Sequence, residues 1–305
     1  MTGKSLSRGG ALFAGSRFPF STASVLPGLL ALAWHWAHFG APPLVHSVLA
    51  LGGILWLHLG ANTLNDYFDW DQSDRINRFA NKFSGGSRRF SHGILSRQAF
   101  LFMAIAFFSL ALASGVVLIF LDRPMVLLIG GLGAAVGILY STTPFSFVSR
   151  GLGELLIFFA FGPLITWGMG YVFSASFSWE YFLMGIPNGF AVTAILWINE
   201  FPDFEADSKS GKRNLVVRLG LKNARVGYIL LILGFFLSVV TLSIMGVFPR
   251  WSLVALLLLP LAGLLSVRLW RGYTEPQRIL PVQGGTIIFQ ALSSVILIAS
   301  VWRLH

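Results

Sequence analysis

Two short acidic stretches hold the residues of this chain that are best suited to chemistry. The first, NDYFDWDQSD at residues 65–74, has four aspartates. The second, NEFPDFEAD at residues 199–207, repeats its pattern of Asn, acid, aromatic residue, any residue and Asp. The whole chain has only 12 acidic residues. Carboxylates placed this close repel one another, so a cation is expected to hold them.

Helical spacing gathers the polar side chains of the first stretch on one face. Asn62, Asn65, Asp66 and Asp69 follow the i, i+3, i+4, i+7 pattern, and His58 precedes them by one turn. Oxygen ligands without any cysteine favour a hard cation. Mg²⁺ fits, because it typically takes one or two carboxylates together with phosphate oxygens.

The second stretch has a similar arrangement. Asn199, Asp203 and Asp207 are spaced by four residues, although Pro202 is expected to kink or end the helix there. The plainer alternative for both stretches is a solvated helix end whose acids pair with nearby basic residues. Those residues are Arg75, Arg78, Lys209 and Lys212.

A basic segment follows each acidic stretch. NKFSGGSRR at residues 81–89 and SGKRNLVVR at residues 210–218 mix Gly and Ser with Lys and Arg. Such loops can close backbone N–H groups and guanidinium groups around a phosphate. The alternative is ordinary positive charge beside lipid head groups. Acidic and basic segments together predict a metal-bridged lipid diphosphate at the mouth of an apolar cavity, with its tail among the helices.

The elements that position these stretches are predicted to be membrane helices. Of 305 residues, 55% are hydrophobic and 11% are charged, with a mean hydropathy of +0.73. A soluble domain of this length could not bury that much apolar surface, so the chain is predicted to be an all-α integral membrane protein. Nine segments of spanning length lie near residues 21–40, 43–69, 98–121, 124–141, 151–173, 180–201, 224–248, 251–270 and 282–303.

The distribution of basic residues predicts an orientation. The N-terminal segment and the loops after the even-numbered spans hold 19 of the 22 Lys and Arg. The positive-inside rule then places the N-terminus and both acidic stretches in the cytoplasm and the C-terminus outside. Because the charge is sorted by side, the net charge of +10 does not indicate nucleic-acid binding. We expect one domain over 1–305, with a cytoplasmic tail (1–20) and cap loops (70–97 and 203–223).

Three blocks resemble the UbiA superfamily of intramembrane prenyltransferases. NDYFDWDQSD resembles the first Asp-rich motif of that family, and NEFPDFEADSKSGKRNLVVRLG at residues 199–220 resembles the second. YSTTPFSFVSRGLGE at residues 140–154 resembles the loop after the fourth helix. The resemblance extends over residues 20 to 300 and implies nine helices around a central cavity.

The residues and the resemblance together assign candidate roles. Asp66, Asp69, Asp203 and Asp207 are the predicted catalytic and metal-binding residues, with Asp74 as a further metal ligand. The predicted diphosphate contacts are Asn65, Asn199, Arg88, Arg150, Lys212 and Arg213. The predicted border of the acceptor or allylic cation comprises His58, Asn62, Tyr67, Tyr140, Glu154 and Trp197.

The resemblance also implies an activity, which is Mg²⁺-dependent transfer of a polyprenyl group to an aromatic ring. FSGGSRR with GILS, and RGLGEL leading into FGPLITWG, favour the branch that prenylates 1,4-dihydroxy-2-naphthoate for menaquinone. Hydroxybenzoate, homogentisate and chlorophyllide are the alternative acceptors. The expected location is a prokaryotic inner membrane, with the active site facing the cytoplasm and membrane lipid around the helices.

Two departures from the family pattern affect these assignments. The third Asp of the first motif falls on Ser73, with Asp71 and Asp74 on either side, so the residue that reaches the metal is open. In the loop after the fourth helix, Val148 occupies a position that is often Lys in the family, which leaves Arg150 as the nearest cation.

The main rival from another class is a secondary transporter, which also uses repeats and intramembrane acids. The acids of this chain are predicted at the rim rather than at mid-span, which favours the enzyme. A phospholipid head-group transferase is excluded, because its compact D-G-x-x-A-R pattern is absent.

Overall fold

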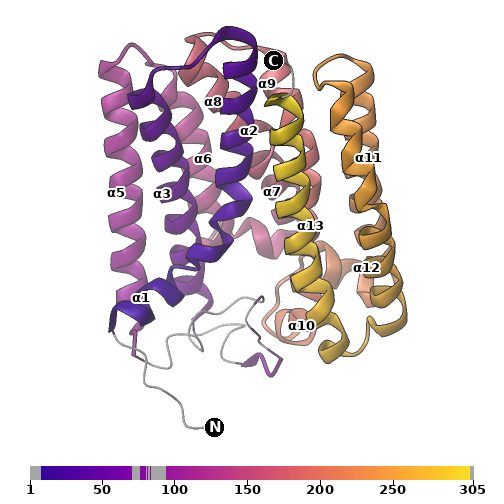
Figure 1. Cartoon of the computed structure of the whole chain (residues 1–305). Helices are drawn as coiled ribbons and strands as arrows, with labels where there is room; N and C mark the ends of the chain where they lie inside the picture. Colours follow the sequence, from indigo (N-terminus) through magenta and orange to yellow (C-terminus); the bar gives the residue numbers. More distant parts are fainter. Residues whose placement is uncertain (1–7, 71–75, 80, 82, 84–93, 303–305) are drawn as a thin grey trace.

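The chain folds as a bundle of long helices (Figure 1). The computed structural model describes residues 8–70, 76–79, 81, 83 and 94–302, and within these ranges it contains helices and no strands. The α-helices are α1 (Arg8–Gly15), α2 (Thr22–Phe39), α3 (Leu44–Asp69), α5 (Arg97–Phe120), α6 (Val126–Ser141), α7 (Gly153–Phe161), α8 (Pro163–Ser174), α9 (Trp179–Met184), α10 (Ile186–Lys209), α11 (Leu215–Ile244), α12 (Leu259–Gly272) and α13 (Pro276–Trp302). Short 3₁₀ helices cover Phe18–Ser21 (η1), Phe147–Arg150 (η2) and Arg250–Leu258 (η3).

Most of the predicted spans are present as long apolar helices. Among the described residues, seven helical stretches are long and apolar enough to cross a membrane. The other two predicted segments correspond to α2 and to the shorter apolar helix α6. Large apolar side chains such as Phe120, Ile244 and Leu257 are more than three-quarters exposed, as expected for side chains that face lipid. The chain is therefore an integral membrane protein.

The segment predicted as one span at 151–173 consists of two helices that break at Gly162. The backbone of Gly162 lies directly against that of Gly185 and Gly189, where an added Cβ would come within 2.6 Å of the Gly185 carbonyl oxygen. Pro163 then begins α8, where the N–H that proline lacks would have no helical partner. The Asn188 side-chain amide donates to the Phe161 carbonyl oxygen at 2.6 Å and so satisfies the backbone at the break.

Pro202 does not end its helix, and the predicted cap loop 203–223 is wrong in its bounds. α10 continues through Pro202 to Lys209, and α11 begins at Leu215, so most of the predicted loop 203–223 is helical. Pro202 has no backbone N–H, so one helical hydrogen bond is missing there. The next turn keeps its own backbone hydrogen bonds, so the helix continues. The start of α11 is stabilised because Asn214 caps it by accepting from the Val217 N–H at 2.8 Å.

Part of the predicted N-terminal tail is also folded. α1 lies across one end of the bundle, whereas the C-terminal end of α13 lies at the opposite end (Figure 1). Ala11 in α1 packs with Leu95, which lies just before α5, and with Phe100, which lies in the first turn of α5. After α1 the chain turns at Arg17, whose backbone is left-handed (φ 54°), and enters η1. This turn directs the Arg17 side chain toward the end of α3.

The crossing at Gly162 gives a first prediction. Gly162→Ala is expected to lower the free energy of unfolding by about 1–3 kcal/mol, because its methyl group would overlap the backbone of a neighbouring helix. The measurement is thermal unfolding in detergent. Gly263→Ala in α12 is the matched control, since nothing lies within 4 Å of an added Cβ there. Equal unfolding midpoints for both variants would contradict the tight crossing.

Candidate active site

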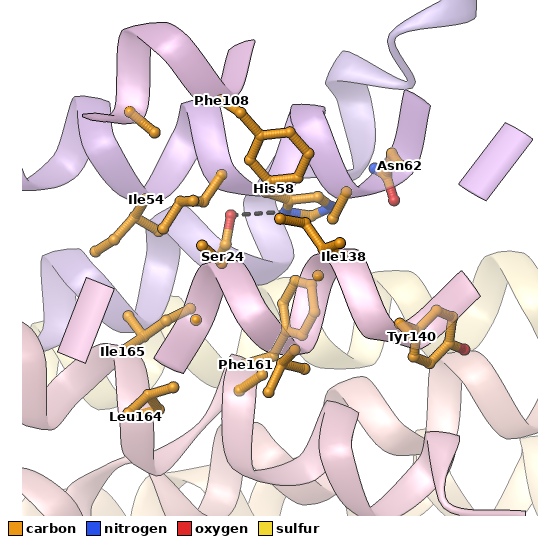
Figure 2. A pocket seen from close by; sticks show the side chains of 18 of the residues that line it. Ser24, Ile54, His58, Asn62, Phe108, Ile138, Tyr140, Phe161, Leu164 and Ile165 are labelled. Carbon is orange, nitrogen blue, oxygen red and sulfur yellow. Dashed lines mark hydrogen bonds between the residues drawn. The ribbon is translucent and has the colours of Figure 1, made fainter. Parts of the chain in front are cut away.

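A long cavity runs through one half of the bundle. Its volume is about 750 Å³, and side chains from α3, α5, α6, α7, α8 and α10 form most of its wall. Figure 2 shows its apolar part, with Ile54, Leu164 and Ile165 at one side of the view. Asn62 and Tyr140 lie at the other side of the same view, so the wall changes from apolar to polar along the cavity (Figure 2).

The acidic face of α3 lies at the polar end of the cavity. Asn65 and Asp69 line the wall. The Ser141 hydroxyl donates to Asn65 Oδ1 at 2.6 Å, and Asn65 Nδ2 donates to Asp69 Oδ2 at 3.3 Å. These bonds orient the Asp69 carboxylate from the side of its own helix.

Asp66 lies on a neighbouring part of the same helix face but has a different environment. It is 1% exposed, and its Oδ1 accepts from Arg17 Nη2 at 2.6 Å. Arg17 itself lines the cavity. A buried carboxylate needs such a partner, because desolvation of an uncompensated charge is costly.

The acidic face of α10 lies on the opposite wall of the same polar end. Asp203 and Asp207, one turn apart, both line the cavity. The Asn77 side-chain amide donates to Asp203 Oδ1 at 2.6 Å, and the Asn214 amide donates to Asp207 Oδ2 at 3.0 Å. Each aspartate is therefore oriented by a carboxamide from outside its own helix.

Lys212 joins the two acidic faces. Its buried ammonium group lies 2.9 Å from Asp69 Oδ1 in α3 and 3.7 Å from Asp207 Oδ1 in α10. Aspartates that are 138 positions apart in the sequence are therefore within reach of one ammonium group. The predicted convergence of the two acidic helix ends is present in the structure.

A chain of carboxamides extends the polar end toward α13. Asn81 Nδ2 donates to Gln283 Oε1 at 3.0 Å, and Gln283 Nε2 donates to Asn199 Oδ1 at 2.9 Å. Asn199 lines the cavity, as Asn65 does on the facing helix. The two motif asparagines thus occupy comparable places, each held by a hydrogen bond from a neighbouring segment.

Three further predicted residues lie on the cavity wall, namely His58, Asn62 and Tyr140. His58 is one turn deeper than Asn62, and its Nδ1 lies 2.8 Å from the Ser24 hydroxyl (Figure 2). Its ring meets the Phe161 ring edge-on. His58 therefore lies among apolar side chains below the aspartates rather than beside them.

Other predicted site residues lie elsewhere. Six predicted site residues within the described ranges do not line the cavity, namely Asp66, Tyr67, Arg150, Glu154, Trp197 and Arg213. Tyr67 stacks under the Arg97 guanidinium, and the Trp197 indole donates to the Ala224 carbonyl oxygen of α11 at 2.8 Å. Arg150 and Arg213 are exposed. Asp71, Ser73, Asp74 and Arg88 lie outside the described residues.

Several residues of the polar end were not identified from the sequence as site residues. They are Arg17, Asn77, Ser141, Asn214 and Gln283. Arg17 is 49 positions from its partner and lies in a segment that was predicted as a tail. The only sequence signal for Asn214 is its helix-capping position just after the basic segment begins.

The arrangement suits the binding of a hard cation and an anion together. Among the described residues, no group of three acidic or histidine side chains is arranged to hold a metal ion by itself. Carboxylates from two helices face each other across a cationic side chain, with carboxamide oxygens beside them. Oxygen donors of this kind match Mg²⁺, which completes its coordination with water or phosphate oxygens.

Comparison with known proteins identifies the family of this fold. Residues 24–281 match the model of the UbiA prenyltransferase family. The 1,4-dihydroxy-2-naphthoate octaprenyltransferase of Escherichia coli (strain K12) is 30% identical over 255 residues, which cover 80% of this chain and 78% of that protein. The enzyme with the same name from Mycobacterium tuberculosis is 28% identical over 279 residues, covering 90% and 91%.

Two solved structures have the same fold. A UbiA homolog from Aeropyrum pernix K1 superposes with a TM-score of 0.68 at 15% identity, over 92% of this chain and 98% of that one. A UbiA homolog from Archaeoglobus fulgidus bound to GPP and Mg²⁺ gives a TM-score of 0.60 at 17% identity, over 94% and 99%.

Convergence of the two acidic faces gives a second prediction. The Asp69→Cys/Asp207→Cys variant is expected to be joined by a short bifunctional thiol reagent, because both side chains reach Lys212. The chain has no cysteine of its own, so no other thiol competes. Protease cleavage between the two positions, followed by denaturing electrophoresis, reports whether the fragments stay together.

The control pairs Asp69→Cys with Glu205→Cys, which lies on the same helix as Asp207 but is exposed and paired with Lys209. Its fragments are expected to separate. Separation of the fragments in the Asp69/Asp207 variant as well would show that the two helix ends do not meet.

Proposed function

Because the chain belongs to the UbiA prenyltransferase family, we propose that it transfers a polyprenyl group from polyprenyl diphosphate to 1,4-dihydroxy-2-naphthoate, a step in menaquinone biosynthesis. The observation that carries this proposal is the convergence of Asp69 and Asp207 at the polar end of a long apolar cavity. The naphthoate acceptor is supported by relatives of that name that align over most of the chain.

Magnesium is the proposed cofactor, as in the Archaeoglobus fulgidus homolog bound to GPP and Mg²⁺. Asp69, Asp203 and Asp207 would hold it, since all three line the polar end of the cavity. Asn65 and Asn199 would present amide oxygens beside them. Bound there, the metal would offset the negative charge of the diphosphate and favour its departure.

Lys212 and Arg17 have a second role in this proposal. Each holds a carboxylate of the site by an ion pair, and each lines the cavity. Their N–H groups can turn to the diphosphate oxygens once the carboxylates have another cation to hold. Hydrogen bonds from charged donors to phosphate are short and strong, so both side chains would stabilise the departing diphosphate.

The apolar part of the cavity accounts for the prenyl tail. Side chains such as Ile54, Leu164 and Ile165 would surround it and keep water away from the allylic cation that forms when the C1–O bond breaks (Figure 2). The aromatic rings of Phe108 and Phe161 also line the cavity, and Tyr140 lines it toward the polar end; aromatic faces stabilise cations. The electron-rich ring of the acceptor then attacks C1, and loss of CO₂ follows.

The proposed topology has nine spans with the site on the cytoplasmic side. It is supported by the sorting of basic residues and by the position of α1 and the end of α13 at opposite ends of the bundle (Figure 1). An odd number of crossings gives this arrangement. A prokaryotic inner membrane is the proposed location, because the named naphthoate octaprenyltransferases are bacterial.

A third prediction concerns binding of the diphosphate. Geranyl diphosphate with Mg²⁺ is expected to raise the unfolding midpoint of the purified protein, and EDTA is expected to cancel the rise. At a ligand concentration 100 times Kd, binding to the native state stabilises it by about 2.7 kcal/mol. Thermal unfolding in detergent measures the effect. A rise that persists in EDTA would contradict the metal-bridged model.

A fourth prediction concerns the aspartates. Asp69→Asn and Asp203→Asn are each expected to reduce prenyl transfer by at least about a hundredfold, because each removes a charge that holds the metal. The protein should still fold, since Lys212 keeps Asp207 as a partner when Asp69 is replaced. Transfer from labelled polyprenyl diphosphate to a panel of aromatic acids is the assay.

Glu205→Gln is the control for these variants, because Glu205 is exposed on the far side of α10. Its transfer rate is expected to match that of the unmodified protein. Turnover retained in both aspartate variants would rule out the metal-bridged mechanism.

A further inference from the structure

The second position of the repeated motif is acidic in both halves but has opposite surroundings. In α3 it is Asp66, which is bound by Arg17 at 2.6 Å. In α10 it is Glu200, which is 5% exposed and has no hydrogen-bond donor at either carboxyl oxygen among the residues that the structure describes. Among the described residues, no ion pair to Glu200 is present, whereas Arg17 pairs with Asp66.

Glu154 differs from Glu200 in having a backbone donor of its own. It lies in the first turn of α7, and one of its oxygens accepts from the Leu215 backbone N–H at the start of α11. Its other oxygen, Oε2, has no hydrogen-bond partner in the part of the chain that the structure describes, and the same holds for both oxygens of Glu200. The two oxygens of Glu200 can therefore accept from a donor that is not part of the protein.

Glu200 lies at the polar end of the cavity. It lines the cavity together with Tyr140, Asp203 and Asp207. The ring of Tyr140 packs on the Gly153 backbone, where an added Cβ would come within 3.2 Å of the ring, so Tyr140 lies beside Glu154 as well. Tyr140 lies at the polar side of the view in Figure 2, away from the apolar wall.

We propose that Glu200 is the hydrogen-bond acceptor for a phenolic hydroxyl of the aromatic substrate. This assignment rests on the prenyl transfer proposed above. A phenolic O–H supplies the donor that a buried carboxyl oxygen otherwise lacks. It also holds the ring next to the aspartates that would hold the diphosphate. A site with a buried acceptor of this kind discriminates against an aromatic compound that lacks the hydroxyl.

A structural role for Glu200 predicts something different. The link between α7 and α11 needs only Glu154, because Glu154 alone accepts from Leu215. If Glu200 were needed for folding, its removal would lower the stability. If Glu200 instead binds the substrate, replacing it by an apolar residue of similar size should leave the stability unchanged or raise it. The variant would no longer bury an acid that has no hydrogen-bond donor.

The experiment combines variants of Glu200 with variants of the acceptor. Glu200→Met removes both oxygens, whereas Glu200→Gln keeps one acceptor oxygen. 1,4-Dihydroxy-2-naphthoate is compared with its two monohydroxy analogues at saturating geranyl diphosphate and Mg²⁺. With the dihydroxy compound, kcat/KM is expected to fall roughly tenfold to a hundredfold in Glu200→Met and less in Glu200→Gln. The KM for geranyl diphosphate should change less than twofold.

The decisive result is the coupling between the two changes. In Glu200→Met, removal of the hydroxyl that Glu200 binds is expected to cause no further loss, because the two partners of one hydrogen bond are removed together. Losses that multiply, an unfolding midpoint that falls in Glu200→Met, or unchanged acceptor kinetics would each overturn the assignment while leaving prenyl transfer intact. If the unmodified protein prenylates no hydroxylated aromatic compound, the proposed function falls and this assignment with it.

Discussion

The site depends on one electrostatic constraint, namely that carboxylates from two helices meet in an apolar environment. Coulomb repulsion between like charges grows as the local dielectric falls, so the ends of α3 and α10 can approach only around a cation. Between Asp69 and Asp207 this cation is the Lys212 ammonium group, and beside Asp66 it is the Arg17 guanidinium group. The basic segment after α10 is therefore part of the acidic site. Acidic and basic segments that are separate in the sequence come together at this site.

The second constraint is the backbone of α7 and α8. A break inside a membrane is tolerated only where neighbouring groups satisfy the freed carbonyls. Asn188 does this at Phe161, and it is held in turn by Gln290 of α13 at 2.9 Å. Close approach of Gly162 to Gly185 and Gly189 allows the broken helix to pack against α10. The wall of the cavity is thus fixed by a buried polar network that lies away from the chemistry.

Features governed by local composition could be predicted from the sequence, and features governed by distant partners could not. The apolar runs predicted the bounds of α3, α5 and α6 to within two residues. The spacing of the acidic residues predicted which side chains share a face on α3 and on α10. The run 151–173 gave no sign of its break, because hydropathy does not record the packing of Gly162 on another helix. Arg17, Ser141 and Gln283 acquire their roles through partners 49 to 84 positions away, which no local pattern encodes.

The composition of α6 has a consequence for the hydrocarbon chain that is proposed to bind in the cavity. Gly130, Gly131, Gly133 and Gly137 all border it, and nothing lies within 4 Å of an added Cβ at the first two. Glycines have no side chains, so this wall is smooth and has no protruding groups that would fit between the methyl branches of a bound chain. For a prenyl chain bound along that wall as proposed, retention would grow with the length of the chain rather than with its pattern of branching, so isoprenoids of different length would share one binding mode.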